Sequence, residues 1–299
     1  MELEALEKLR KAGEINAKAR DYGKGLVKAD ASFLEVSDRI EDFILNHGGS
    51  LAFPVQLSRN DTAAHSCASH EDKTLFKEGD IIKLDLGVHI DGYVTDSAVT
   101  VNLGGKEHDS LLKASQEALD AAIKAVAPGI TVTEVGKAIQ AAIEARGFRP
   151  VRNLSGHGLG RYIVHGPPTI PNYDTGDKTE LEEGQLIAIE PFASMGAGIV
   201  YEGSEAEVFM MAGKKAVRSM ITRNVLKEID TFHGLPFTTR WLARKLSLPQ
   251  VNFALRELQN LEIIRMYPPL IDKAHGLISQ AEHTVIVGEK PEVITRSRE

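Results

Sequence analysis

Residues 78–85 read Glu-Gly-Asp-Ile-Ile-Lys-Leu-Asp, and residues 183–190 read Glu-Gly-Gln-Leu-Ile-Ala-Ile-Glu. The two stretches share one pattern of residue types at a separation of 105 positions. In each, a glycine typical of a turn is followed by an apolar run typical of a buried strand. We therefore interpret each stretch as a turn and a strand that ends in a carboxylate, and the pair as two copies of one structural unit.

The segments that precede these strands also repeat. Residues 35–48 carry Glu, Val, Ile, Ile and Gly at offsets that recur without change in residues 134–147. The isoleucines are four positions apart, which predicts an amphipathic helix that ends at the glycine. A further helical pattern precedes each copy, at 6–20 and 111–124. Two helix–helix–strand units would each deliver an acidic side chain to a shared seam, where duplicated halves commonly build a site.

Composition and length describe a soluble globular protein. The 299 residues suffice for one large domain or two ordinary ones, and 42% are hydrophobic and 26% charged. No apolar run approaches the ~18 residues that a membrane span needs, and the N-terminus lacks the basic and apolar regions of a signal peptide. A single cysteine, Cys67, excludes an intrachain disulfide framework, and we expect it to be a packed thiol. We expect a cytoplasmic protein that does not bind membranes.

A basic segment interrupts the second unit and has no counterpart in the first. Residues 212–273 contain 11 Lys or Arg and 5 Asp or Glu, whereas the whole chain has a net charge of −7. The pattern predicts three helices and then an apolar strand, at 222–232, 237–245, 249–261 and 262–270. This order resembles a winged-helix unit. We therefore expect one domain over residues 1–299 that contains an inserted, helical winged-helix-like subdomain at 213–275.

A hairpin is predicted around Asp91 and Gly92. Asp-Gly between two β-rich runs is a strong signal for a two-residue turn. With that turn, Asp85 lies opposite Ala98, and Asp96 is its diagonal neighbour, with Cα atoms on the order of 7 Å apart. Two carboxylates on one half-buried face repel each other unless a cation lies between them. The alternative is that one or both of them face water.

Three further residues complete an acidic cluster. Glu190 is the internal counterpart of Asp85, and Glu282 opens a last apolar strand. His157 lies in the sequence Ser-Gly-His-Gly-Leu-Gly at 155–160, where glycines allow a sharp turn and a close approach. Each residue has an ordinary alternative, which is a solvated strand end for either glutamate and a glycine-rich turn with an incidental histidine for the imidazole.

One imidazole and four carboxylates make a hard, oxygen-rich ligand set. Such a set suits a pair of divalent ions such as Mn, Fe or Co better than a structural zinc, which prefers Cys and His. Two ions about 3.5–4 Å apart, bridged by carboxylates, would activate a shared water for hydrolysis and polarise a carbonyl group. The sequence has no GxSxG, P-loop, HExxH or paired CxxC motif, so nothing in it indicates those chemistries.

This ligand set resembles, in order and context, the dinuclear metal centre of the pita-bread metallopeptidases, and most closely that of type II methionine aminopeptidases. Its members are Asp85, Asp96, His157, Glu190 and Glu282. The similarity extends over essentially the whole chain, through residues 52–54, 60–65, 83–98, 153–165, 189–194, 267–270 and 282–286. It implies an α/β pita-bread (creatinase/aminopeptidase) fold with pseudo-twofold duplicated halves, in which the inserted subdomain marks type II. The absence of a charged N-terminal extension looks archaeal.

The resemblance also implies a role for each ligand. Asp85 would bind one divalent ion, and His157 and Glu190 would bind the other. Asp96 and Glu282 would bridge the two ions, which would be Co, Mn, Fe or Zn. Glu190 would also act as general base and acid, because it would take the proton of the attacking water and pass it to the leaving amine.

Four more residues would contact the substrate if the resemblance holds. His65 and His165 would bind the substrate and stabilise the transition state. Phe53 and Tyr267 would line a pocket for the methionine side chain. Without the resemblance, both histidines would be interpreted as surface residues.

We expect a monomeric dimetal hydrolase that removes the initiator methionine from nascent proteins with a small second residue. One alternative is a prolidase, an Xaa-Pro peptidase of the same fold, although prolidases usually carry an extra N-terminal domain and the first metal strand here begins at Ile81. Another is a non-catalytic relative that binds nucleic acid or the ribosome. Arg240, Arg244 and Lys245, on one predicted helix of the basic subdomain, are candidates for ribosome association, with a merely solvated face as the alternative.

Overall fold

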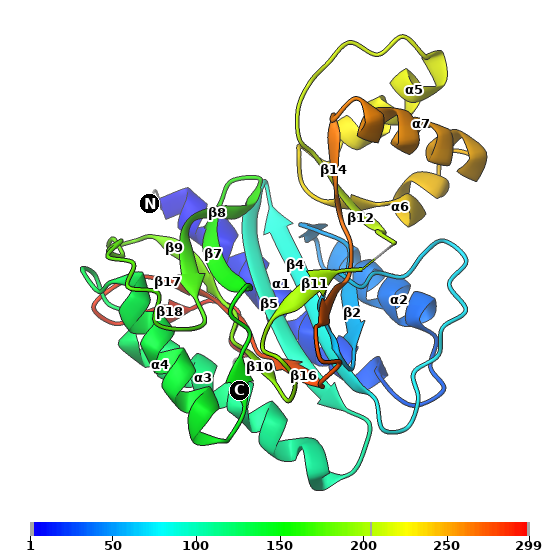
Figure 1. Cartoon of the computed structure of the whole chain (residues 1–299). Coiled ribbons are helices and arrows are strands. Elements are labelled where there is room, and N and C mark those ends of the chain that lie inside the picture. Colours follow the sequence, from blue (N-terminus) through cyan, green and yellow to red (C-terminus); the bar gives the residue numbers. More distant parts are fainter. Residues whose placement is uncertain (1–2, 204, 298–299) are drawn as a thin grey trace.

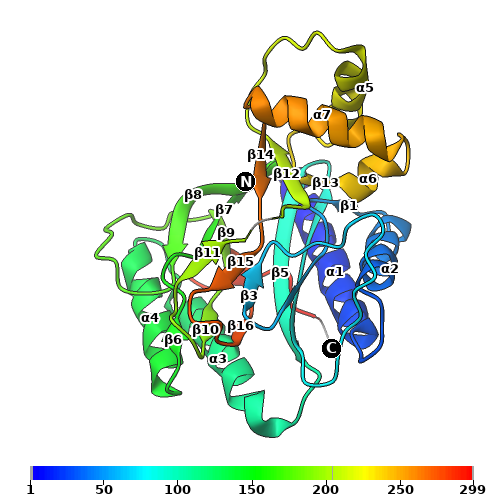
Figure 2. The same ribbon diagram turned by 45° about the vertical axis from the view of Figure 1, so that its right-hand side comes forward.

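The computed structural model describes residues 3–203 and 205–297. Figure 1 shows two mixed α/β halves side by side, and a smaller helical lobe that projects from one edge of them. In Figure 2 the helix pairs of the two halves lie on the outside, with the strands between them. In the described part of the chain, no helix is both long and apolar enough to cross a membrane.

The first half consists of two helices and a four-stranded sheet. Its elements are α1 (Leu3–Leu26), α2 (Phe33–Asn46), β1 (Ser50–Leu51), β2 (Gln56–Arg59), β4 (Ile81–Ile90) and β5 (Tyr93–Asn102), and β4 pairs with each of the other strands. Ile40 and Ile44 of α2, at helical spacing, share one core with Leu84 and Leu86 of β4. Because side chains alternate along a strand, Asp85 points away from this core toward the second half.

The second half is built in the same way. Its elements are η1 (Lys106–His108), α3 (Asp109–Ala125), α4 (Val132–Ala145) and a five-stranded sheet in the order β18 (Glu292–Val293), β17 (His283–Ile286), β9 (Leu186–Ile189), β7 (Ser155–Gly160) and β8 (Ile163–Pro171). Two three-stranded sheets complete the body, with the orders β16 (Ile278–Gln280), β10 (Phe192–Ser194), β6 (Arg149–Pro150) and β11 (Val200–Glu202), β15 (Leu270–Asp272), β3 (Thr62–Ala64).

The sequence repeat corresponds to a structural repeat. Gly48 and Gly147, which follow α2 and α4, both have φ of 80°. Two residues after each glycine a short strand begins, and β1 pairs with β4 as β6 pairs with β10. Gly79 and Gly184, in the turns before β4 and β9, also have positive φ, at 89° and 76°. Glycine adopts this left-handed conformation without steric cost, so the repeated glycines mark the same turns in both halves.

The predicted hairpin forms with the predicted register. Asp85 of β4 lies opposite Ala98 of β5. Asp91 and Gly92 have φ of 50° and 87°, as a two-residue turn with a right-handed twist requires. The expectation that each repeated strand ends in its carboxylate is right for Glu190, which directly follows β9, and wrong for Asp85. There β4 continues because it pairs with β5 along its whole length.

The lobe is a small helical unit with its own core. It contains α5 (Met220–Asp230), α6 (Thr239–Ala243), α7 (Leu248–Asn260) and a sheet in the order β13 (Phe237–Thr238), β12 (Val208–Met211), β14 (Ile264–Tyr267). Ile229, Trp241 and Leu258 are among the buried residues that the helices contribute to this core. Figure 2 shows α7 lying across the lobe, above the strands that connect it to the body.

Two predicted elements of the lobe differ from the structure. The helix expected at 237–245 is shorter, because its first two residues form β13 and Thr238 then caps α6. The strand expected at 262–270 is divided between β14 and β15. Pro268 and Pro269 stand between them, and proline has no N–H to donate to a sheet.

Candidate metal centre

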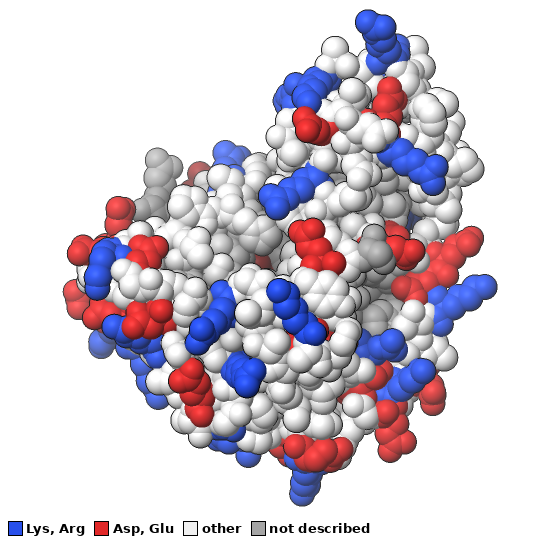
Figure 3. All heavy atoms as spheres, in the orientation of Figure 1, with Lys and Arg blue, Asp and Glu red and all other residues white. Residues whose placement is uncertain are grey.

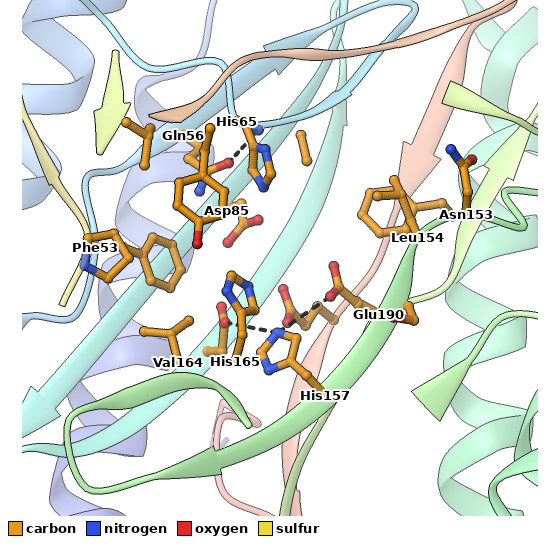
Figure 4. Close-up of a pocket in the computed structure, with 18 of the residues that line it drawn as sticks. Phe53, Gln56, His65, Asp85, Asn153, Leu154, His157, Val164, His165 and Glu190 are labelled. Carbon is orange, nitrogen blue, oxygen red and sulfur yellow. Dashed lines mark hydrogen bonds and ion pairs between the residues drawn. The ribbon is translucent and has the colours of Figure 1, made fainter. Parts of the chain in front are cut away.

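Five side chains that the sequence singled out converge where the two halves meet. Asp85 and Asp96 come from β4 and β5, and His157 comes from β7 of the other half. Glu190 directly follows β9, and Glu282 directly precedes β17. Figure 4 shows side chains from both halves pointing toward one another at the polar end of a cavity.

The distances show that the cluster is tight. His157 Nε2 lies 3.8 Å from Asp96 Oδ2 and 3.5 Å from Glu190 Oε1. The ligand atoms of Asp96, His157 and Glu282 all lie within 4.8 Å of one another. Gln280 Nε2 lies 3.4 Å from Asp85 Oδ2 and 3.3 Å from Glu190 Oε2, so it links the two acids that occupy equivalent positions in the repeat.

Hydrogen bonds across the seam hold the strands that carry the cluster. Thr284 Oγ1 accepts from the backbone N–H of Asp96 and donates to the Asp96 carbonyl, both at 2.7 Å. The backbone N–H of Glu282 donates to the Ala98 carbonyl at 3.0 Å. Because β17 also pairs with β9, which Glu190 follows, one strand aligns acids from both halves.

The glycines on either side of His157 serve close packing rather than a turn. The expected sharp turn is absent, because residues 155–160 form β7 and none of them has a positive φ. A Cβ at Gly156 would overlap the carbonyl oxygen of Ala188, and a Cβ at Gly158 would overlap the carbonyl of Pro167. Glycine at both positions therefore allows β7 to approach its neighbouring backbone and to present His157 to the acids.

The clustered acids have raised pKa values because they are buried. Burial raises the pKa of Asp85 to about 7. Burial, followed by repulsion from the neighbouring carboxylates, raises the pKa of Asp96, Glu190 and Glu282 well above their ordinary values. Four carboxylates therefore cannot all be charged in this pocket without a compensating positive charge.

The donor atoms that remain free fit divalent cations. Asp85 Oδ1 and Asp96 Oδ1 are buried and have no hydrogen-bond partner among the described residues. Burial lowers the pKa of His157 to about 3, which keeps the ring neutral. His157 Nδ1 lies 3.3 Å from the Gly158 carbonyl, so an N–H there donates and leaves the lone pair of Nε2 directed at the acids. Unsatisfied oxygens and one available imidazole nitrogen are the ligands expected of such a metal site.

A cavity of about 430 Å³ opens beside the cluster, and every residue that the sequence indicated for substrate binding lines it. The four acids and the one imidazole described above are among the residues that line it. Its other walls include Phe53, His65, Val164, His165, Val208, Pro236 and Tyr267. Figure 4 places Phe53 and Val164 on one side of the cavity, and Asn153 and Leu154 on the other.

Two neutral histidines face the cavity. Burial lowers the pKa of His65 to about 4 and also lowers the pKa of His165. The His165 ring is edge-on to the His157 ring, with 4.5 Å between centroids. The His65 ring is edge-on to Tyr267 at 5.5 Å, and its Nδ1 lies 3.3 Å from the Pro268 carbonyl. An N–H at Nδ1 would donate to that carbonyl, so Nε2 of His65 is available as an acceptor.

Three residues that contact the acidic cluster or line the cavity did not stand out in the sequence. Gln280 lies two residues before Glu282, and Gln56 pairs with Asp85 in the sheet and accepts the His65 N–H at 2.6 Å. Gln280 could have been predicted, because residues two positions apart in a strand point to the same side and Gln280 is two positions from the predicted ligand Glu282. No sequence pattern indicated Arg265, because it lies on β14 of the lobe and lines the cavity from there. Within the described residues it is the only Lys or Arg that lines the cavity.

Of the three cations expected to contact the ribosome from the helix at 237–245, Arg240 is not at the surface, and the other two are paired with acids. Arg240 is 2% exposed and binds Glu41, and Arg244 binds Asp38 at 2.6 Å. Lys245 binds Glu228 at 2.7 Å. These cations neutralise acids within the protein, so they do not present unpaired charge to a partner. Cys67 is buried, and burial raises the pKa of its thiol to about 12, which agrees with a packed role.

Comparison with known proteins gives one consistent result. The family model for metallopeptidase family M24 matches residues 7–226. A methionine aminopeptidase from Archaeoglobus fulgidus is 42% identical over 296 residues, which is 99% of this chain and 99% of that protein. The structure of methionine aminopeptidase from Thermotoga maritima has a TM-score of 0.72 at 24% identity and covers 99% of this chain and 98% of its own. A thermophilic Arx1 has a TM-score of 0.88 at 16% identity, with coverage of 100% and 92%, and both structures show the shared fold alone.

Proposed function

The chain belongs to metallopeptidase family M24, and we propose that it removes the N-terminal methionine from newly made proteins whose second residue is small. The observation that supports this activity best is that the acidic cluster lines the same cavity as the apolar side chains of Phe53, Val164 and Tyr267. An α-amino group and a scissile carbonyl placed at the acids would leave an unbranched apolar side chain in contact with Phe53 and Val164.

We assign the metal ligands from this arrangement. Asp85 would hold one divalent ion, and His157 and Glu190 would hold the other. Asp96 and Glu282 would contribute a carboxylate to both ions, in keeping with the short distances that join Asp96, His157 and Glu282. When bound, the ions lower the pKa of a water molecule and polarise the scissile carbonyl. The metals that suit this donor set are Co, Mn, Fe and Zn.

Side chains of the protein transfer the protons and bind the peptide bond. Glu190, whose side chain is 14% exposed at the cavity, takes the proton of the attacking water and delivers it to the leaving amine. His65 and His165 are neutral at physiological pH and contact the peptide bond. Free Nε2 of His65 accepts a hydrogen bond from a substrate N–H, and His165 stabilises charge that develops on the carbonyl oxygen.

Phe53 and Tyr267 form the walls of the methionine pocket. Phe53 is buried beside β4, and Tyr267 comes from β14 of the lobe. The two aromatic residues therefore belong to different parts of the fold and close on the substrate side chain from both sides. A substrate side chain bound between them would displace water from the cavity, which strengthens the electrostatic contacts made there.

A peptide panel tests the proposed activity. The purified enzyme, supplied with a divalent metal, is offered Met-Ala-Ser, Met-Leu-Ser and Ala-Pro. Rapid release of free methionine from the first, with much slower release from the second, supports methionine removal before a small residue. Preferential cleavage of Ala-Pro would indicate a prolidase, and no cleavage of any peptide with two bound ions would indicate a non-catalytic binding protein.

We also propose that the protein is a cytoplasmic monomer that works on nascent chains at the ribosome. The exposed cations suited to RNA are Lys214, Arg218, Arg223 and Lys227, which precede or lie on α5. Figure 3 shows Lys and Arg side chains spread over the exposed face of the lobe, with few acids among them. Co-sedimentation with ribosomes at low salt, compared with the triple variant Lys214→Glu, Arg218→Glu, Arg223→Glu, tests the docking. Equal sedimentation of both proteins would reject it.

A further inference from the structure

A buried ion pair fastens the lobe to the first half of the body. Arg240 of α6 is 2% exposed and Glu41 of α2 is fully buried. The guanidinium donates two hydrogen bonds to one carboxylate, from Nη1 to Oε2 at 2.8 Å and from Nη2 to Oε1 at 2.6 Å. Trp241 Nε1 also donates to Glu41 Oε2, at 2.9 Å. Two neighbouring residues of the lobe thus converge on one acid of the body.

The pair extends into a network that reaches the backbone of the body. The N–H of Val55 donates to Glu41 Oε1 at 3.4 Å. Asp38 accepts from Arg240 and, at 2.6 Å, from Arg244. Glu41 therefore receives donors from the lobe and from the segment that follows β1, and it holds the two at a fixed separation.

Stability alone does not account for such a pair. The free energy needed to move two charges out of water is roughly as large as the free energy gained from their attraction. Proteins in which apolar residues of similar volume replace a buried ion pair are often equally stable or more stable. What a bidentate Arg–carboxylate pair adds is direction, because two parallel hydrogen bonds fix both the distance and the angle between the elements that carry them. An apolar contact at this place would allow the lobe to slide.

Both sides of the pair lead directly to the walls of the cavity. On the body side, Val55 lies between Phe53 and Gln56, and both of these line the cavity. On the lobe side, Pro236 lines the cavity four residues before Arg240. The lobe strand β12 pairs with β13 beside Arg240 and, on its other edge, with β14. β12 contributes Val208 and β14 contributes Tyr267 to the same cavity. The ion pair therefore connects a segment of the body and a segment of the lobe that both line the cavity.

We propose that the Glu41–Arg240 ion pair sets the width of the pocket that receives the N-terminal side chain, so that both are positioning residues for substrate selectivity. The proposal rests on the proposed methionine removal. Neither residue touches the metal ligands, so the pair acts on side-chain recognition rather than on the chemical step.

The test replaces the pair without leaving a buried charge. Single variants such as Glu41→Gln would take the bidentate carboxylate away from the buried Arg240 and risk misfolding, so the double variant Glu41→Leu, Arg240→Met is used. A matched control, Glu117→Leu, Arg146→Met, removes an ion pair between α3 and α4 far from the cavity. For each protein, circular dichroism, bound metal, and kcat and KM for Met-Ala-Ser and Leu-Ala-Ser are measured.

The expected result is a split between KM and kcat. The folded double variant keeps its metal and a kcat within about twofold of the wild type, while its KM for Met-Ala-Ser rises about tenfold or more and its preference for Met over Leu falls by a similar factor. The control variant keeps wild-type values. Unchanged KM and selectivity in the folded double variant would overturn the proposal, as would a parallel loss of metal, kcat and fold.

A measurement without substrate separates this proposal from the proposed activity. Spin labels on cysteines introduced at Glu35 of α2 and Asn252 of α7, both exposed, report the distance between body and lobe. A single narrow distance distribution in the parent protein should broaden or shift in the double variant. If the wild type released no methionine, the proposed activity would fail, but the distances would still decide the positioning role. An unchanged distribution would reject that role whatever the activity.

Discussion

The phenyl ring of Phe53 occupies the space in which a side chain at Gly87 would stand. A Cβ added at Gly87 would lie 2.6 Å from Phe53 Cδ1, which is closer than atoms approach in proteins. Gly87 is also the cross-strand partner of Asp96 in the β4–β5 hairpin. Gly87 therefore lies between Asp96, a proposed metal ligand, and Phe53, which lines the proposed methionine pocket. Any side chain at position 87 would displace the Phe53 ring.

Gly87→Ala should weaken substrate binding without removing metal. The added methyl group overpacks the site, which costs about 1–3 kcal/mol and pushes the Phe53 ring into the cavity. We expect a raised KM for Met-Ala-Ser and normal metal content, and Phe53→Leu in the same chain should restore part of the KM. Gly25→Ala, where a Cβ meets nothing within 4 Å, is the control. A wild-type KM in Gly87→Ala would contradict the assignment of Phe53.

Asp85→Asn should lose bound metal and activity together. The change removes one negative charge from the cluster while it preserves the shape of the side chain. Metal analysis after dialysis, together with the rate of methionine release, measures both effects. Asp42→Asn, an exposed change on α2, should leave both unaltered. Retention of two ions with near-normal turnover in Asp85→Asn would show that the ligand assignment is wrong.

His65→Ala and His165→Ala should each keep the metal and lose catalytic efficiency. Neither ring is assigned as a ligand, and loss of one oriented hydrogen bond at a developing charge costs about 2–4 kcal/mol, or roughly 10²–10³ in kcat/KM. Steady-state kinetics and metal content are compared with those of His70→Ala, which changes an exposed histidine. If either cavity variant binds no metal, that histidine is a ligand and not a substrate contact.

The metal-free protein should lose stability as pH rises from about 6.5 to about 8. Burial raises the pKa of Asp85 to about 7 and raises those of Asp96, Glu190 and Glu282 well above their ordinary values. In this window the folded state binds more protons than the unfolded state, so ΔG of unfolding falls with increasing pH.

Two comparisons sharpen this pH prediction. The buried histidines have lowered pKa values and act in the opposite direction, but only below about pH 6.5, where histidine in the unfolded chain becomes protonated. Divalent metal should flatten the dependence, because it replaces the protons. Thermal unfolding of the chelated and metal-loaded protein at several pH values measures this. A midpoint that stays constant or rises with pH in the chelated protein would contradict the electrostatic account.

The local elements of this fold follow from short-range sequence signals. The register that places Asp85 opposite Ala98 follows from the two residues Asp91 and Gly92, because turn geometry determines hairpin pairing. The helix ends at Gly48 and Gly147 follow from a conformation that glycine adopts most easily. The internal repeat identified Glu190 as the counterpart of Asp85 without any structural information.

The sequence did not predict which residues that are distant along the chain lie close together in the fold. Gln280 lies between Asp85 and Glu190 only because separate strands meet at the seam. Arg240 was expected on a basic surface, since its helical pattern carries three cations, yet its partner Glu41 is 199 positions away. Burial and pairing of charges depend on which distant elements pack together, and no local pattern encodes that. The same reason explains why Arg265 was not recognised as a cavity residue.

Metal reconstitution of the chelated enzyme tests the central claim most directly. Apo-protein is titrated with Mn, Fe, Co or Zn under anaerobic conditions, and bound metal and methionine release from Met-Ala-Ser are followed in the same samples. The account predicts no release without metal, and release that rises with bound metal and reaches its plateau by two ions per chain, with Asp85→Asn failing to respond. Full release by the chelated enzyme, or none with any of the four metals bound, would contradict it.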